Sequence, residues 1–140
     1  KVYPKWAELP NLDLYLDQVL LYVNQLDSSS IVDDDKGLTA AMINNYVKNG
    51  HLDKPIKKKY NRKQLARLIV ITCLKNVFSI QEISKTINSL TEEESSEIMY
   101  NNFVMCMNGE MRDGLPEVIV AACDTVRLYK KTHDLVEKLK

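Results

Sequence analysis

Apolar residues recur at helical spacing over most of the chain, which predicts a mainly helical protein. The first helix is expected over residues 12–26, with Asn11 as its N-cap. One face of this helix is apolar, so that face is expected to pack on the core. It consists of Leu12, Leu16, Val19, Leu20 and Val23. The polar and acidic residues that follow predict a loop.

A second helix is expected over residues 40–49, capped by Thr39 and ended by Gly50 in the left-handed conformation. At about 100° per residue its apolar side chains fall on one arc, which is expected to face the core. The opposite arc is small and polar and carries a single cation. It consists of Ala40, Ala41, Asn44, Asn45 and Lys48.

Residues 51–60 contain Pro55 and three consecutive lysines, and they predict a short two-stranded connector or wing. Asn61 and Gln64 then have the spacing of a capping box, which marks a helix start. The helix that follows, to about residue 76, is apolar almost all round. Because such a helix is typical of a protein interior, we expect it to be the central element of the core.

Two more capping-box spacings occur downstream. Ser79 with Glu82 predicts a helix to about residue 90. Thr91 with Glu94 predicts that a further helix opens there and runs from residue 92 to about residue 111. Three such boxes in succession indicate an all-helical protein.

The last helix is expected to begin at Pro116, which suits a first helical position, after a turn at residues 113–114. It runs to the C-terminus. Its apolar residues are roughly heptad-spaced, so the helix could close the core or pair with a second copy of the chain. These residues are Ile119, Ala122, Val126, Tyr129, Val136 and Leu139.

Together these elements predict an all-α single domain over residues 1–140. It divides into an N-terminal arm and helix over residues 1–36, a core over residues 37–90, and a C-terminal helical pair over residues 91–140. A chain of 140 residues has the usual length of one domain.

The composition argues against several classes of function. No apolar run approaches the roughly 18 residues of a membrane span, so we expect no membrane insertion. The three cysteines lie far apart among apolar neighbours, which is typical of free thiols in a reducing compartment and predicts a cytoplasmic protein without a metal site. The acidic run at residues 33–35 lacks the pattern of a calcium loop, and we expect a solvated loop or one that covers a basic surface. No phosphate loop, nucleophile elbow or catalytic carboxylate pair occurs, so we expect neither an enzyme nor a cofactor.

Local charge changes this picture most. The chain has 19 basic and 19 acidic residues, yet eight of the basic ones lie between Lys48 and Arg67 with a single acid, Asp53. We call residues 48–67 the basic cluster. Local charge says more about partners than net charge does, and a cluster of this kind suits the phosphates of a nucleic acid.

The order of a short helix, a tight turn, a basic connector and an apolar helix resembles the MerR-type winged helix-turn-helix. In that family a recognition helix ending in Tyr-x-x-x-Gly-x-Leu precedes a wing with a proline, and a Phe-Ser-x-x-Glu-Ile turn opens a later helix. Over most of the chain, including the stretch LDLYLDQV, the sequence more closely resembles an uncharacterised bacterial family, the domain of unknown function 1836. The positions that match the MerR pattern are Ile43, Tyr46, Gly50, Leu52, Pro55, Tyr60, Leu65, Phe78, Ser79, Glu82 and Ile83.

The MerR resemblance implies a winged helix-turn-helix core with a short β-wing over about residues 38–90. Asn44 and Asn45 stand where the family usually has an Arg-Tyr pair that contacts DNA. The wing is shorter here, lacks its turn glycine and has Lys58 in place of its arginine, and Val77 replaces the glycine before the Phe-Ser turn. The resemblance therefore does not carry the base preference of that family over to this chain.

We expect a transcriptional regulator that binds double-stranded DNA, as a homodimer through its last helix. The asparagines would read an adenine edge in the major groove, with basic side chains on phosphates at either side. The alternative is a non-catalytic protein-interaction module that keeps the winged scaffold and binds an acidic partner through the same lysines. The candidate DNA-binding residues are Thr39, Ala40, Ala41, Asn44, Asn45, Lys48, Lys54, Lys57, Lys58, Lys59, Tyr60, Arg62, Lys63 and Arg67.

Overall fold

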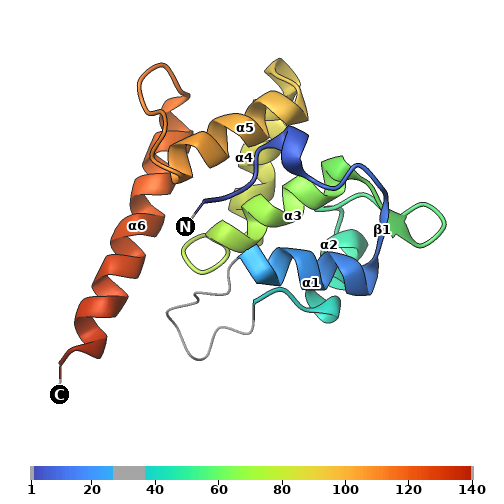
Figure 1. Ribbon diagram of the computed structural model, residues 1–140, viewed down its shortest axis with the longest axis horizontal. Coiled ribbons are helices and arrows are strands. Elements are labelled where there is room, and N and C mark those ends of the chain that lie inside the picture. The colour runs from blue at the N-terminus through green and yellow to red at the C-terminus, as the bar shows by residue number, and fades with distance from the viewer. Residues whose placement is uncertain (1, 27–36, 140) are drawn as a thin grey trace.

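The computed structural model describes residues 2–26 and 37–139. The chain is mainly helical, as the spacing of its apolar residues predicts, with one two-stranded antiparallel sheet (Figure 1). The acidic run at residues 33–35, expected to be a loop, lies outside the described residues. In chain order the elements are η1 (Trp6–Glu8), β1 (Leu14–Tyr15), α1 (Leu16–Leu26), α2 (Ala40–Lys48), β2 (Lys59–Tyr60), α3 (Arg62–Leu74), α4 (Ile80–Glu93), α5 (Ser96–Met107) and α6 (Glu117–Glu137).

Helix α3 is the centre of the core, as its apolar character predicts. It packs against α1, α4, α5 and α6, and its Leu68 and Ile71 are fully buried. The predicted capping box starts it. Asn61 Oδ1 accepts a hydrogen bond from the backbone N–H of Gln64 at 2.9 Å, and Gln64 Oε1 accepts one from the backbone N–H of Asn61 at 2.7 Å. The helix ends at Leu74, slightly before the expected residue 76.

Helix α1 begins later than the sequence predicts. Leu14 and Tyr15 form β1 and pair with β2, so the helix starts at Leu16 and Asn11 is not its N-cap. Leu12, expected within the helix, is 74% exposed. The backbone of this segment is satisfied by strand pairing instead of helical hydrogen bonds, and the prediction from helical spacing alone is wrong here.

The third predicted capping box does not form. The Thr91 hydroxyl instead donates to the Ile87 carbonyl at 2.8 Å inside α4, which continues to Glu93. Glutamate is a good helix former, so the run of glutamates extends α4. Ser95 caps the next helix, and its Oγ accepts from the backbone N–H of Ile98 at 3.1 Å. Helix α5 therefore spans residues 96–107 rather than 92–111.

Helix α6 has two halves with different surroundings. It begins at Glu117, so Pro116 is its N-cap rather than its first residue. Ile119, Cys123 and Val126 are buried, and this first half closes the core. The second half projects from the body of the molecule (Figure 1). Its exposed apolar residues are Leu128, Leu135 and Val136, and the exposed Leu139 follows the end of the helix.

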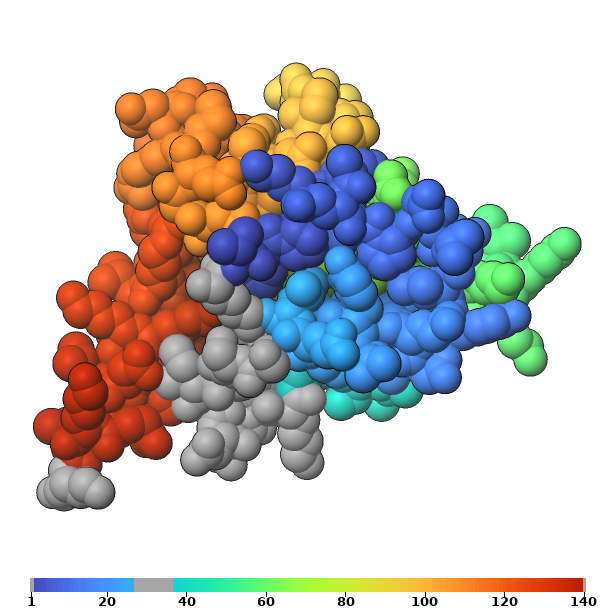
Figure 2. All heavy atoms as spheres, viewed as in Figure 1, coloured from blue at the N-terminus to red at the C-terminus, as the bar shows by residue number. Residues whose placement is uncertain are grey.

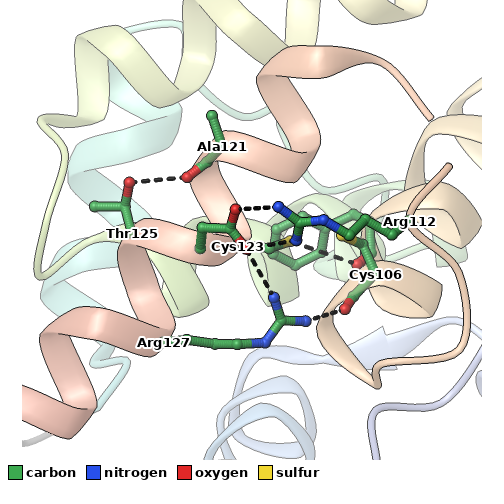
Figure 3. Close-up of polar contacts among 8 residues, drawn as sticks. Cys106, Arg112, Ala121, Cys123, Thr125 and Arg127 are labelled. Carbon is green, nitrogen blue, oxygen red and sulfur yellow. Dashed lines mark hydrogen bonds and ion pairs between the residues drawn. The ribbon is translucent and has the colours of Figure 1, made fainter. Parts of the chain in front are cut away.

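Two arginines fix the direction in which α6 leaves the core (Figure 3). Arg112 makes a two-pronged ion pair with Asp124 at 2.7 and 2.6 Å, which lowers the pKa of Asp124 and raises that of Arg112. Arg127 also bonds to Asp124, at 3.2 Å, and donates to the carbonyl of Cys106. Cys106 and Cys123 are buried free thiols in this junction, and burial raises the pKa of Cys123.

Candidate nucleic-acid interface

Helix α2 presents outward the polar face that the sequence predicts. Its cap is Thr39, whose hydroxyl accepts from the backbone N–H of Met42 at 3.2 Å, and Gly50 follows the helix with φ of 79°. Ile43 and Tyr46 are buried and fix the helix on the core. On the outward face, Ala41, Asn44, Asn45 and Lys48 are exposed, and Thr39 and Ala40 are partly exposed.

The two asparagines differ in what they can offer a ligand. Asn49 Nδ2 donates to Asn45 Oδ1 at 2.9 Å, so Asn45 keeps its amide N–H groups as donors. The Asn44 side chain makes no hydrogen bond to another described residue, and it offers both a donor and an acceptor. A free amide can bond to both N6 and N7 of adenine in the major groove. Asn44 is therefore the better placed of the two for a base contact.

The basic connector contains a hairpin with a two-residue turn, which we call the lysine hairpin (residues 56–59). Ile56 and Lys59 exchange two backbone hydrogen bonds of 3.0 Å each. Lys57 and Lys58 lie between them with φ of 52° and 69°, the left-handed conformation of a type I′ turn. Such a conformation costs roughly 1–2 kcal/mol for each residue with a Cβ. The hairpin therefore holds two strained lysines at its tip, and it projects beyond the surrounding surface (Figure 2).

Replacing Lys58 with glycine is expected to stabilise the protein by about 1 kcal/mol, because glycine adopts a positive φ without strain. Denaturant unfolding measures this free energy directly. The control is Lys54→Gly, which removes a lysine from a position with negative φ. That variant is expected to be neutral or slightly destabilised, because glycine adds entropy to the unfolded chain. Equal effects of the two substitutions would contradict the strain argument.

The N-terminal segment holds the returning arm of the hairpin. β2 pairs antiparallel with β1, so Tyr15 lies opposite Lys59. The Lys59 ammonium lies 5.1 Å from the centre of the Tyr15 ring, in a cation–π contact. The expected two-stranded connector is thus completed by a strand at residues 14–15, which the sequence of the connector does not predict.

Among the described residues, no ion pair involves an exposed lysine of the basic cluster. The ion pairs found among the described residues lie elsewhere, at Lys5 with Glu110 and at the α5–α6 junction. Figure 1 places α2 and the lysine hairpin on the side of the molecule away from the projecting half of α6. The positive charge is therefore available to an external anion. The exposed lysines are Lys48, Lys54, Lys57, Lys58 and Lys63.

Three candidate residues face inward instead. Tyr60 is buried, and burial raises its pKa. Arg62 Nη2 donates to the carbonyl of Leu9 at 3.2 Å, which ties the N-terminal arm to α3. Arg67 Nε donates to the carbonyl of His51 at 2.6 Å, and burial lowers the pKa of this arginine. These side chains hold the scaffold on which the exposed lysines sit.

Two exposed residues beside the hairpin were not among the sequence-predicted candidates. Tyr15 is 48% exposed under Lys59, and Ile56 at the base of the turn is 73% exposed. An aromatic ring next to a cation can stack on a sugar or a base. A signal for Tyr15 exists in the chain, because leucine alternates with other residues from residue 12 to residue 16, which is the period of a strand.

Neither a cluster of metal ligands nor a membrane-spanning helix is found among the described residues. Within residues 2–26 and 37–139, no three His, Cys, Asp or Glu side chains gather in a way that could hold a metal ion. In the same part of the chain, no helix combines the length and the apolar character needed to cross a bilayer.

A family model described as a domain of unknown function (DUF1836) matches residues 4–103. The matched part contains α2, the lysine hairpin and α3, whereas α6 lies outside it. No curated protein and no solved structure matches the chain.

Proposed function

The chain belongs to the DUF1836 family, and we propose that it is a DNA-binding transcriptional regulator whose α2 enters the major groove of a duplex. The lysine hairpin and Lys48 then contact phosphates on either side of that groove. The observation that carries this proposal is a polar helix face next to exposed lysines that form no ion pair with another described residue. The order of α2, hairpin, α3 and α4 supports a winged helix-turn-helix core of the MerR type. The protein so proposed is a non-catalytic, cytoplasmic domain.

The regulator acts as a homodimer, joined along a face of α6 that the monomer leaves uncovered. Residues on this face follow the alternating spacing of three and four that a coiled-coil seam requires. The seam differs from the heptad pattern that begins at Ile119, because Ile119 and Val126 of that pattern are buried in the core. The seam residues on α6, all exposed, are Val118, Ala121, Thr125, Leu128, Thr132 and Leu135, and the exposed Leu139 continues the spacing just after the helix.

The first half of the seam borders an apolar groove of about 190 Å³ between α4 and α6, whose lining includes Phe78 and Ile83. The Thr125 hydroxyl donates to the Ala121 carbonyl at 2.8 Å within the helix (Figure 3), which leaves the seam without an unsatisfied donor there. The second half of the helix projects and carries the exposed leucines. A two-fold antiparallel pair would place the projecting half of each helix beside the groove of the other copy.

Charges along one edge of the seam support the antiparallel arrangement. Glu117 and Asp124 lie on this edge in the first half of α6. Lys131 lies on it in the second half, and Lys138 continues it at the C-cap of the helix. Because like edges face each other in an antiparallel pair, each acid lies across from a lysine of the second copy. Asp124 already forms an ion pair with Arg112 in the monomer, so Glu117 and Lys138 are the better pair for testing contacts between the two copies.

In vitro selection from random duplexes tests the proposed function. A dimer is expected to select a site with two related half-sites, and binding should weaken log-linearly with salt concentration. Binding to duplexes without any selected sequence would leave only electrostatic attraction and overturn the regulator. Capture of an acidic protein partner that duplex DNA does not displace would favour the interaction module instead.

A further inference from the structure

A cavity of about 210 Å³ lies behind the interface, where the turn after α2 meets α3, α4 and the start of α5. Its wall includes Gly50, His51 and Asp53 from the turn, and Lys63 and Arg67 from α3. The side chain of Gln64, which also lines it, holds the carbonyls of residues 53 and 54 at 2.9 and 3.1 Å. The cavity is thus formed by a turn that is fixed in place.

Arg67 is the principal charged group of this cavity. Its guanidinium is oriented by two hydrogen bonds, from Nε to the His51 carbonyl at 2.6 Å and from Nη2 to Ser84 Oγ at 2.9 Å. A guanidinium has five N–H donors, so these bonds leave others available. Among the described residues no carboxylate forms an ion pair with it, although Asp53 attracts it from a distance. Arg67 is therefore a half-buried, oriented cation without a bonded anion.

The remaining polar wall also suits a negative charge. Lys63 lies at the rim of the cavity, while Asn88 and Thr91 come from α4. Ser96 is the first residue of α5, so the positive end of that helix dipole lies at the cavity. Against Lys63 and Arg67, the described residues of the wall include a single carboxylate, that of Asp53.

We propose that this cavity binds a small organic oxyanion, a carboxylate or a phosphate monoester, with Arg67 and Lys63 as its charge partners. The cavity is smaller than the roughly 300–1,000 Å³ of sites for drug-sized ligands, so the ligand is a small metabolite. A bound anion would hold Arg67, and Arg67 holds the turn that ends α2. Anion binding at this site does not depend on DNA binding. The inference that the anion regulates DNA binding, by fixing the turn after α2, rests on the proposed function.

Titration of the ¹⁵N-labelled protein with inorganic phosphate and with succinate, at constant ionic strength, tests the site. The expected result is a saturable shift of the amide signals of Gly50, Asn88 and Ser96. Asn88→Asp places a negative charge on the wall and is expected to weaken binding about tenfold. The control is Gln81→Glu, the same change at an exposed position of α4 outside the cavity, which is expected to leave binding unchanged. Dispersion of the amide spectrum shows whether each variant is folded.

Two results would overturn the anion site. One is a shift that does not saturate or that spreads over the lysine hairpin, because this marks non-specific attraction to the basic cluster. The other is that a mixed-sequence duplex shifts these cavity signals while phosphate and succinate do not, because the anion bound there is then a DNA phosphate. A protein that binds the small anions but no duplex keeps the site and loses only the regulator, so the two proposals fail separately.

Discussion

Replacing both Lys57 and Lys58 with glutamate is expected to weaken binding to duplex DNA by about a hundredfold near 0.1 M salt. Each phosphate contact contributes roughly a factor of eight at that salt through counterion release, so the loss of two contributes about sixtyfold. Repulsion between the new carboxylates and the phosphates adds to this loss. Both lysines are exposed at the tip of a projecting hairpin, and the substitution therefore removes no core contact.

The salt dependence distinguishes lost phosphate contacts from a general loss of binding. Fluorescence anisotropy over a range of salt concentrations should give a slope of log affinity against log salt that is shallower by about two. The matched control reverses Lys85 and Lys130, which lie on α4 and α6 away from the hairpin. Equal losses in the two double variants would show that only total charge matters, and the proposed docking of the hairpin would then be wrong.

The second large effect concerns the proposed dimer. Replacing Leu128 and Leu135 with glutamate is expected to convert a dimer of twice 16.1 kDa into a monomer of 16.1 kDa. Each change acts twice in a two-fold interface, and burial of a leucine contributes about 1.5–3 kcal/mol, so the total loss is about 6 kcal/mol or more. These side chains are 62% and 54% exposed in the monomer, so its helicity should not change. Light scattering coupled to gel filtration gives the mass, and circular dichroism gives the helicity.

A charge exchange tests the antiparallel arrangement. Lys138→Glu alone should weaken the dimer, because it places two acids across from each other. The double variant Glu117→Lys with Lys138→Glu should recover most of that loss, because the opposite charges are restored. A wild-type protein that remains monomeric at high concentration would refute the seam itself.

The sequence predicts best those features that depend on a few neighbouring residues. The caps at Thr39, Asn61 and Ser79 all form, because each is a local hydrogen bond between a side chain and the first turn of a helix. Thr91 has capping-box spacing, as Asn61 and Ser79 do, but it caps no helix, because its segment also favours continuation of α4. A capping signal therefore marks a boundary only where the preceding helix has a reason to end, as it has at Gly50.

The features that the sequence does not predict depend on contacts between distant segments. The pairing of β1 with β2 joins residues 14–15 to residues 59–60. That pairing places Tyr15 beside the candidate interface and forces α1 to start late. Within the basic cluster, charge alone could not separate Arg67, which clamps the turn after α2, from the exposed lysines. Arg67 finds its partners at His51 and Ser84, 16 and 17 residues away along the chain.

The thiols at the α5–α6 junction allow alkylation to report when α6 detaches from α5. Cys106 and Cys123 are 1% and 0% exposed, and the thiolate is the form that alkylating reagents attack. Because burial also raises the pKa of Cys123, alkylation of this thiol requires α6 to detach from α5. The half-buried Cys73 is more accessible and should be modified first. Mass spectrometry of timed alkylation would thus record how often this helix opens, with no label added to the chain.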